Sequence, residues 1–531
     1  MNFEDGTSNL LAKEFVAVIL VGEGDQLAPL TSGNGEAPSP KALVPIANKP
    51  MIDYVLAWIE PSGITEVLVV CPTAHRAQIS HHIQSGASSS GYPSLSITFT
   101  TYEPADTNGT CVALLAAKPR ITHDFVLLPC DFVPPSDLTL QAILDAFRVD
   151  VAVDGAIATG CWFAPSRPDK GAVPDEWGSM LSPSTIVWDQ ASGSLLHIDT
   201  EEDAERNGDD IELRMALVNK FPRTRLSTAL QDSHVYVCRH AVIDALALKP
   251  HFESFNKEFI PWLCKLQYQR TKQRKYGYVF KPDGETTTQT LALRHATLSL
   301  AARHQNAEWD GQSNDGSPSA PTASLMAASA PSSPIDHDDD DAQVKPSLRV
   351  GLRVHRGNLA GRANTLPALL ELNRHFLGQT PYVLPTDQKD RALIDTKAQI
   401  ASDSLVGEST QVGERTSVKR SVVGRHCVLA RGAKLSGCVL LDHCVVGENA
   451  KLENCILGAG TKVGAKADMK GVVTQTGYEV GAGEQARHEK LEASHWAAGD
   501  SDDDEEDEES EDGSDEDAGE DDEDDDEDSD D

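Results

Sequence analysis

Several classes of protein are excluded by what this sequence lacks. No apolar run approaches the ~18 residues that a membrane-spanning helix needs, and Met1–Glu14 is polar and acidic, unlike a signal peptide. The ten cysteines are scattered, without a C-x-x-C pair or a His/Cys cluster at zinc spacing. We therefore expect a soluble protein of a reducing compartment that has no membrane contact and no bound metal.

Basic residues are missing from one end of the chain. In Ser501–Asp531, 24 of 31 residues are Asp or Glu and none is Lys or Arg. Removing these charges from the formal net charge of −37 leaves −13 for Met1–Asp500, so the rest is only mildly acidic. The sequence shows no dense basic stripe, which argues against direct nucleic-acid binding. The segment 500–531 is predicted to be a disordered, self-repelling acidic tail.

The rest of the chain is organised around Val16–Met51. The apolar run Val16–Val21 is stopped by Gly22 and Gly24, a pattern typical of a buried parallel strand that enters a tight loop. Such a loop allows backbone N–H groups to approach phosphates, and Lys41 downstream can meet their charge. An ordinary strand–loop–helix corner explains the glycines equally well.

Strands and helices alternate through the next two hundred residues. The patterns predict strands at Glu66–Cys71, Ser96–Tyr102, Asp124–Leu128 and Ser233–Arg239, and helices at Met51–Glu60, Thr110–Lys118, Ala241–Ala247 and, amphipathic and basic, Lys265–Lys275. This alternation predicts a right-handed, doubly wound, Rossmann-like α/β domain over 15–303. Ligands of such sheets bind at the carboxyl ends of the strands, where Gly22, Gly24 and Asp131 fall.

Composition changes after this domain. The segment 304–347 is rich in Ser, Ala, Pro and Asp and is predicted to be a disordered linker, because it has too little apolar surface to bury. The following segment, 348–403, either completes the α/β domain or leads into the next one, and Glu371–Arg374 is expected on a helix.

A repeat dominates 404–480. Apolar residues recur every five or six positions, at Val406, Val412, Val418, Val423, Leu429, Leu435, Leu441, Val446, Leu452, Leu457 and Val463. Glycine directly follows six of these eleven residues. This period fits neither an α-helix nor an isolated hairpin. It predicts a coil of short parallel strands with the apolar residues stacked inside, glycines at the corners, and Cys427, Cys438, Cys444 and Cys455 as core fillers.

The opening stretch resembles the sugar-nucleotide pyrophosphorylases in its order of Gly-x-Gly, Pro-Leu, Pro-Lys and Pro-Ile. By this resemblance Asp131 would occupy the place of the magnesium ligand, and Gly109-Thr110 the segment that contacts base or sugar. The copy is altered: the loop is one residue shorter, Asp25-Gln26 replace Thr-Arg, and Cys130 replaces glycine. The resemblance therefore implies a degenerate nucleotide site, with Gly22, Gly24, Lys41, Gly109 and Asp131 as remnants and with no cofactor.

A nucleotidyltransferase-like domain followed by a hexapeptide left-handed β-helix is shared by GDP-mannose pyrophosphorylases and two subunits of translation initiation factor 2B. The segments Val418–Gly424, Arg362–Thr365, Glu371–Arg374 and Glu258–Leu263 resemble the factor's gamma subunits. Epsilon subunits add a C-terminal helical exchange domain, for which we expect no place between the repeat and the acidic tail.

This resemblance implies a non-catalytic, cytosolic subunit of the guanine-nucleotide exchange factor for initiation factor 2. The expected partners are an epsilon subunit, the alpha, beta and delta subunits, and initiation factor 2 as the substrate G protein. Two alternatives stay open: an active sugar-nucleotide pyrophosphorylase that uses Lys41 and Asp131, and a β-solenoid scaffold unrelated to translation.

Overall fold

The computed structural model describes residues 14–33, 38–85, 92–103, 109–165, 177, 185–200, 203, 210–280, 348–379 and 387–492. The predicted linker at 304–347 and the acidic tail at 500–531 lie outside these residues. None of the helices described is long and apolar enough to cross a membrane.

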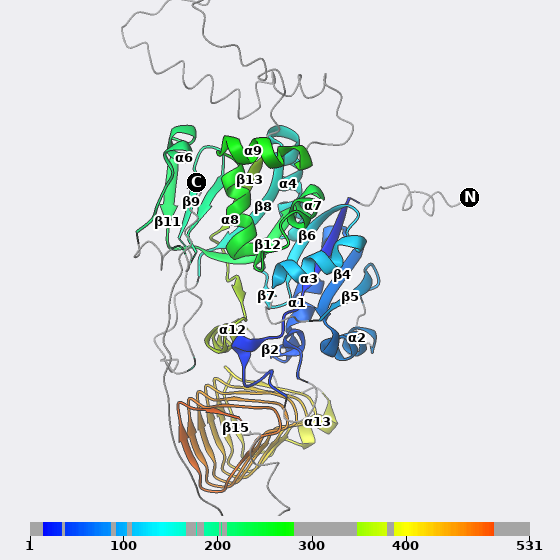
Figure 1. The fold of residues 1–531 in the computed structure, drawn as a ribbon. Helices are drawn as coiled ribbons and strands as arrows, with labels where there is room; N and C mark the ends of the chain where they lie inside the picture. The colour runs from blue at the N-terminus through cyan, green and yellow to red at the C-terminus, as the bar shows by residue number, and fades with distance from the viewer. Residues whose placement is uncertain are drawn as a thin grey trace, which may run out of the picture. The chain divides into compact units, whose positions relative to one another are not determined.

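A ten-stranded sheet forms the centre of the α/β part, in the order β11-β9-β10-β13-β8-β12-β6-β1-β4-β5 (Figure 1). Its last four strands are mutually parallel. The inner three are apolar on both faces, as expected for strands covered on two sides, whereas the edge strand β5 is only half-buried. They are β6 (Asp124–Pro129), β1 (Phe15–Leu20), β4 (Glu66–Pro72) and β5 (Ser96–Tyr102). The predicted doubly wound α/β arrangement is confirmed here.

The other half of the sheet is mixed rather than parallel. It contains β8 (Ala156–Phe163), β9 (Ile186–Asp189), β10 (Ser194–Ile198), β11 (Thr224–Ser227), β12 (Gln231–Cys238) and β13 (Arg349–His355). Strand β12 runs antiparallel to both β6 and β8, whereas β13 lies parallel to β8. Because β13 buries Val350 and Leu352 in the middle of the sheet, the segment after 348 completes the α/β core.

Helices cover both faces of the sheet. Helices α1 (Met51–Ile59), α2 (Arg76–Gln84) and α4 (Leu140–Asp154) contribute to one apolar core, and α3 (Thr110–Ala117), α7 (Ala241–Ala247) and α8 (Ile260–Leu266) to the other. The predicted basic helix at Lys265–Lys275 is wrong as one element, because α8 ends at Leu266 and α9 spans Arg270–Tyr276. The short helix α6 (Met215–Lys220) lies before β11.

Smaller elements connect this part to the repeat. They are the paired strands β2 (Pro45–Ile46) and β3 (Lys49–Pro50), the paired strands β7 (Phe132–Val133) and β14 (Gly361–Arg362), and helices α12 (Leu366–Gln379) and α13 (Gln388–Ala392). The helix expected around Glu371–Arg374 is confirmed as the middle of α12.

The repeat forms a three-sided coil of parallel strands (Figure 1). Sheet 1 contains β15 (Gln399–Ile400), β18 (Ser417–Lys419), β21 (Lys434–Ser436), β24 (Lys451–Glu453), β27 (Asp468–Lys470) and β30 (Gln485–Arg487). Sheet 2 contains β16 (Leu405–Val406), β19 (Val422–Val423), β22 (Val439–Leu440), β25 (Ile456–Leu457), β28 (Val473–Thr474) and β31 (Lys490–Leu491). Sheet 3 contains β17 (Gln411–Val412), β20 (Val428–Leu429), β23 (Val445–Val446), β26 (Lys462–Val463) and β29 (Glu479–Val480). The coil thus extends beyond the predicted range 404–480 at both ends.

One turn of the coil takes 17 residues, so that Val418 aligns with Leu435, Leu435 with Leu452, and Leu452 with Met469. The predicted apolar stack is confirmed except at one position. Leu440, rather than Leu441, points into the coil, because Leu440 aligns with Val423 and Leu457. The four predicted core cysteines are all fully buried within the coil.

The glycines of the repeat serve a purpose other than the one expected. The glycines at 407, 413, 424, 447, 458 and 464 do not have positive φ; instead, a Cβ atom on each would lie 2.5–2.9 Å from atoms of the next turn. Glycine is needed there because successive turns approach each other closely. The left-handed positions are taken by other glycines, such as Gly432 and Gly460, and by non-glycine residues, among them His426 and Asn449.

Sheet 2 is apolar on its outer face as well as its inner face. Its outward residues Val422, Val439, Ile456 and Val473 are buried in one cluster with residues of α12 and of the α/β part. Polar contacts cross the same boundary: Asn48 donates a hydrogen bond to the Val423 carbonyl, at 2.8 Å. The coil and the α/β part therefore share one apolar core along this face.

Adjacent residues of β23 provide a test of the coil's core. Val446 is fully buried whereas Val445 is 38% exposed, so we expect Val446→Asp to lower the free energy of unfolding by several kcal/mol, because it buries an unpaired charge. The matched variant Val445→Asp should change it little. Chemical denaturation followed by circular dichroism measures both. Equal destabilisation by the two variants would contradict the inward and outward assignment.

Candidate functional site

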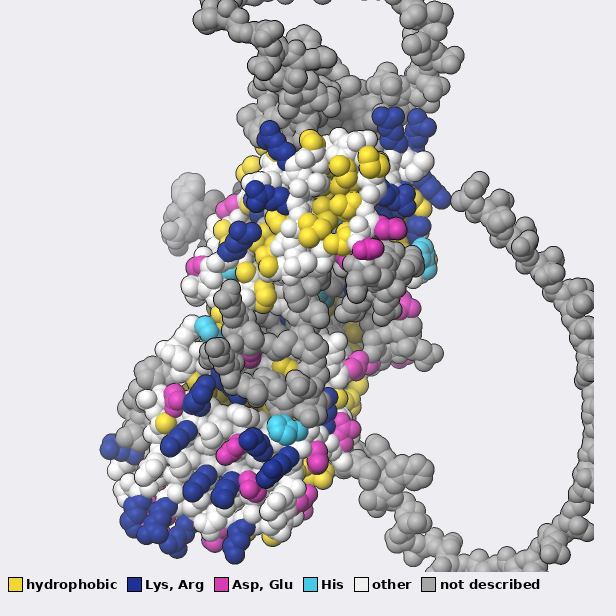
Figure 2. Space-filling model, turned by 90° about the vertical axis from the view of Figure 1, so that its left-hand side faces the viewer, with side chains coloured by type: hydrophobic (Ala, Val, Ile, Leu, Met, Phe, Trp, Pro, Cys, Tyr) yellow, Lys and Arg dark blue, Asp and Glu magenta, His cyan; other side chains and the backbone are white. Residues whose placement is uncertain are grey.

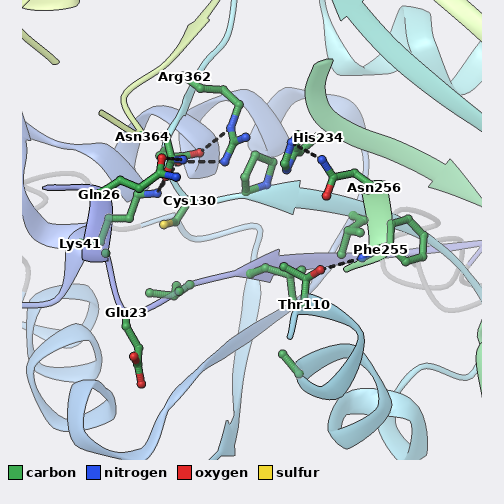
Figure 3. A pocket seen from close by; sticks show the side chains of 18 of the residues that line it. Glu23, Gln26, Lys41, Thr110, Cys130, His234, Phe255, Asn256, Arg362 and Asn364 are labelled. Atoms are coloured by element: carbon green, nitrogen blue, oxygen red, sulfur yellow. Dashed lines mark hydrogen bonds and ion pairs between the residues drawn. The ribbon is translucent and has the colours of Figure 1, made fainter. Parts of the chain in front are cut away.

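A cavity of about 480 Å³ lies at the carboxyl ends of β1 and β6 (Figure 3). All five residues predicted as a nucleotide-site remnant line it, namely Gly22, Gly24, Lys41, Gly109 and Asp131. They come together because β1 and β6 are parallel neighbours that end side by side, Leu20 opposite Pro129. The position agrees with the general rule that ligand sites lie at the carboxyl edge of a doubly wound sheet.

Two of the glycines are required by local geometry. Gly24 has φ of 97°, in the left-handed region, and a Cβ atom there would lie 3.0 Å from Thr31 and 3.1 Å from Lys41. At Gly109, which precedes α3, a Cβ atom would lie 2.9 Å from the carbonyl oxygen of Glu253. Nothing lies within 4 Å of the corresponding position at Gly22, so packing alone does not explain that glycine.

Asp131 forms a buried ion-pair cluster with two cations. Its Oδ2 atom lies 2.5 Å from Lys41 Nζ and 3.0 Å from Arg362 Nη2, and its Oδ1 atom accepts from Arg362 Nε at 3.1 Å. Asp131 is 1% exposed, Lys41 6% and Arg362 9%. Both carboxylate oxygens are therefore already occupied by N–H donors, in the fork geometry that makes Arg–carboxylate pairs strong.

The charge state of Asp131 follows from these contacts. Burial alone would raise the pKa of Asp131, but the charges and hydrogen bonds of Arg362 and Lys41 hold it well below its ordinary value. The carboxylate is ionised at neutral pH and is compensated by two positive charges. Burial raises the pKa of the neighbouring Cys130 thiol to about 12, so that thiol stays protonated.

A hydrogen-bonded chain continues from Lys41 toward the glycine loop. Lys41 Nζ also donates to Asn364 Oδ1, and Asn364 Nδ2 donates to Gln26 Oε1 at 2.7 Å. Figure 3 shows Lys41, Gln26, Asn364 and Arg362 converging, while Glu23 points away from them. Gln26 thus lies where the sugar-nucleotide pyrophosphorylases carry Thr-Arg. Its side chain accepts the hydrogen bond from Asn364 and so helps to fix the segment 362–364.

The opposite end of the cavity carries a second polar group. His234 has φ of 56°, in the irregular part of β12, and lies 2.8 Å from the side-chain amide of Asn256. Burial, together with the charge of Arg362, lowers the pKa of His234 well below its usual value, so that the imidazole is neutral at pH 7. Burial raises the pKa of Asp232 to about 6, against the opposing effect of a hydrogen bond from Tyr236.

Sequence reasoning missed several of these residues. Arg362 and Asn364 were part of a motif that carried the family resemblance, yet their approach to Asp131, across more than 200 residues, was not predicted. His234 and Asn256 have no pattern of their own: His234 lies in a segment predicted only as a strand, and no element was predicted at Asn256. The only sequence signal for these residues was the motif Arg362–Thr365, which the sequence analysis used for the family resemblance and not for the site.

The observed donors do not fit a magnesium ion at Asp131. Mg²⁺ prefers near-octahedral oxygen ligands, usually one or two carboxylates with phosphates and water. Here the groups that contact the carboxylate are two cations, and no group of three or more His, Cys, Asp or Glu side chains suited to a metal occurs within the described ranges. Both oxygens of the Asp131 carboxylate are thus occupied by Lys41 and Arg362 and are not available to a metal ion.

Two protein families match this chain, one in the α/β part and one in the coil. Residues 16–160 match the family model described as nucleotidyl transferase, and residues 387–485 match the model described as the EIF2B subunit epsilon LbH domain. The second match agrees with the three-sided coil of sheets 1–3, which is a left-handed β-helix.

Several curated proteins are similar to this chain over much of its length. The chain is 28% identical over 407 residues to translation initiation factor eIF2B subunit gamma of Schizosaccharomyces pombe, covering 76% of this chain and 74% of that protein. It is 20% identical over 411 residues to the gamma subunit of Dictyostelium discoideum, covering 74% and 83%. It is also 23% identical over 266 residues to the epsilon subunit of D. discoideum, covering 49% and 35%.

These gamma-type matches cover about three quarters of this chain and of each relative, whereas the epsilon-type match covers about a third of that relative. The order of the two family models along the chain agrees with the fold. We conclude that this chain is similar, over about three quarters of its length, to gamma subunits of translation initiation factor eIF2B.

Proposed function

We propose that the chain is a non-catalytic subunit of the guanine-nucleotide exchange factor that acts on translation initiation factor 2. It pairs with an epsilon subunit, within an assembly that also contains alpha, beta and delta subunits, and this assembly promotes release of GDP from initiation factor 2. The chain scaffolds and stimulates epsilon in the cytosol, and it takes no direct part in nucleic-acid or membrane binding. The similarity to gamma subunits supports this proposal, and so does the buried ion-pair cluster at Asp131.

The observation that carries the non-catalytic assignment is the buried cluster of Asp131, Lys41 and Arg362. A nucleotidyltransferase needs a carboxylate free to hold a metal and a cation free to hold phosphate. In this chain the two candidates for those roles neutralise each other at 2.5 Å, and Arg362 covers the remaining carboxylate oxygen. In this proposal Gly22, Gly24, Lys41, Gly109 and Asp131 are remnants that now support the fold.

The same geometry weighs against the alternative of a sugar-nucleotide pyrophosphorylase. For Lys41 and Asp131 to act on a nucleotide, both would have to leave a buried ion pair, and breaking such a pair is costly. An unrelated solenoid scaffold would keep the coil, but it would not account for the matches to gamma subunits over about three quarters of the chain.

We expect no pyrophosphorylase activity from this chain. Each preorganised group lost from a transition state typically costs ~10²–10³ in rate, and here both Lys41 and Asp131 are engaged elsewhere. The measurement is GTP release from GDP-mannose with pyrophosphate and magnesium, with an active GDP-mannose pyrophosphorylase as the positive control. Turnover of GDP-mannose, or of a related sugar nucleotide, above background would overturn the non-catalytic assignment.

Asp131→Asn separates a structural role from a functional one. The substitution leaves Lys41 and Arg362 buried without their anion, so we expect it to cost about 3–5 kcal/mol in unfolding free energy. GDP release per folded complex, measured below the lowered melting temperature, should be unchanged. The companion variant Arg362→Gln leaves Asp131 paired with Lys41 and should destabilise less. A tenfold loss of exchange by a fully folded Asp131→Asn complex would show that the old site still works.

The direct test of the proposal is release of labelled GDP from initiation factor 2. This chain alone should not accelerate release, whereas a mixture with epsilon should exceed epsilon alone, because a second docking surface lowers the free energy of the encounter complex. Val446→Asp should abolish that gain and Val445→Asp should retain it. Robust release by this chain alone, or no gain on mixing, would contradict the proposal.

A further inference from the structure

Four cations from different helices meet on a surface of the α/β part that the site described above does not use. Lys272 of α9 lies within electrostatic range of Lys265 of α8, of Arg214, which directly precedes α6, and of Lys249, which follows α7. We call these four residues the Lys272 cluster. Helix α9 contains no acidic residue and adds three further cations, Arg270, Arg274 and Lys275. The basic run found in the sequence is therefore one part of a larger cluster.

The described part of the chain supplies no counter-charge to this cluster. Among the residues that the structure describes, no carboxylate oxygen lies within 4.0 Å of any of the four cations. Acidic residues of the neighbouring elements have other contacts. Asp244 of α7 pairs with Lys118 at 3.0 Å, and Glu258 accepts hydrogen bonds from two backbone N–H groups. Asp199, just after β10, interacts with His197.

The four cations therefore repel one another. Burial, together with the charges of the other three members, lowers the pKa of Lys272 to about 8. Lys249 and Lys275 lie over the ring of Tyr276, with their Nζ atoms 5.2 Å and 5.5 Å from its centroid, but a ring contact leaves their charge in place. Unbalanced like charge destabilises a compact fold. The fold itself thus gives no reason for keeping these cations together.

Exposed apolar side chains lie around the same cluster. Four of the nine large hydrophobic residues that are exposed in the described part of the chain lie on its elements, namely Met215 and Val218 on α6, Leu248 after α7 and Tyr278 after α9. Met215 is 70% exposed and Tyr278 60%. We call these four side chains and the cluster together the Lys272 surface.

The elements of the Lys272 surface are packed against one another. Helix α6 contacts the turn between α8 and α9, where Lys220 donates to the Gln267 carbonyl at 2.5 Å. A small apolar core joins them, made of Leu196, Leu217, Phe221 and Tyr268. Figure 2 views the molecule from the side on which Figure 1 shows α6 and β11. Hydrophobic side chains gather there over the α/β part, with Lys and Arg side chains on both sides of them (Figure 2).

We propose that the Lys272 surface binds an acidic segment of a partner protein in which carboxylates stand next to apolar side chains. The carboxylates would balance the cluster, and the apolar side chains would bury Met215 and Tyr278, since exposed apolar patches with a polar rim mark protein contacts. A free anion or a nucleic acid would balance the charge but leave the apolar side chains in water. The partner is defined by this chemistry alone, whether or not the chain acts in an exchange factor.

Binding of short synthetic peptides to the full chain tests this chemistry. The probe is a fluorescein-labelled peptide of alternating Glu and Leu, followed by fluorescence anisotropy at about 0.15 M salt. A Glu/Ser peptide of equal charge and a Lys/Leu peptide of equal apolar content are the controls. We expect the Glu/Leu peptide to bind about tenfold more tightly than either control, because it alone offers both carboxylates and apolar side chains.

Variants separate binding from folding. Lys249→Gln/Lys272→Gln should weaken binding of the Glu/Leu peptide about tenfold, and Met215→Ser should also weaken it. The lysine variant should keep or raise the melting temperature, because it removes repulsion within the fold. The matched control Lys434→Gln/Lys466→Gln changes two exposed lysines of the coil and should bind like the parent chain. Equal binding by all these variants would overturn the proposal.

The native protein supplies a second arm, purified under mild salt with its bound proteins. Acetylation of Lys249, Lys265 and Lys272 should be about tenfold slower there than after the bound proteins are removed at about 1 M salt, where the screening length falls to about 3 Å. Lys466 should react equally in both states. A carbodiimide, which joins Lys amines to carboxylates in contact, should link the protected lysines to Asp or Glu of a partner, within a segment that also carries apolar residues.

Other occupants would give different results, and each would overturn the proposal. Equally tight binding of the Glu/Ser peptide, or full displacement of the Glu/Leu peptide by equimolar inorganic pyrophosphate, would assign the surface to a free anion. Self-association that Met215→Ser abolishes would assign it to a second copy. Protection that nuclease treatment removes would assign it to nucleic acid. Lysines of the cluster that react equally with and without the bound proteins would show that no partner binds there.

Discussion

The structure depends on burial of a sheet that is apolar on both faces. In sheet 2 the inward residues, such as Val423 and Leu457, fill the coil, and the outward Val422 and Ile456 fill the boundary with the α/β part. Exposing the second set to water would remove a large apolar area from the core, at ~25 cal/mol for each Å². The coil therefore does not fold as an independent unit but shares an apolar core with the α/β part. Trp177 adds a polar contact to the coil by donating a hydrogen bond to the Gly471 carbonyl, at 2.8 Å.

This shared core also explains how Arg362 is held against Asp131. Strand β14 brings Arg362 onto Asp131, and α12 begins four residues later and packs against sheet 2. Asn373 of α12 is fully buried and accepts a hydrogen bond from the Ala47 backbone at 2.8 Å. The segment from β14 to α12 thus both pairs with the Asp131 carboxylate and connects the α/β part to the coil.

Periodicity predicted the parallel half of the sheet and the coil, because burial imposes it, but it did not indicate β8 to β11 or β13 of the mixed half. The parallel strands, α12 and the inward stack of the coil follow from apolar spacing alone. The exception at Leu441 arises because sheet 2 is apolar on both faces, so adjacent Leu440 and Leu441 give no alternation to choose between. The candidate site was only half predictable. Local motifs indicated Gly24, Lys41 and Asp131, but Arg362 reaches the site through a contact across 231 positions, which local spacing does not encode.

The central claim is that this chain works as a subunit of an exchange factor and not as a free enzyme. The most direct measurement is purification of the native chain under mild salt, followed by identification and quantification of the proteins bound to it. The account predicts an epsilon-type subunit in equimolar amount, accompanied by the alpha, beta and delta subunits and by initiation factor 2. A chain that purifies alone, or with proteins unrelated to translation, would contradict it.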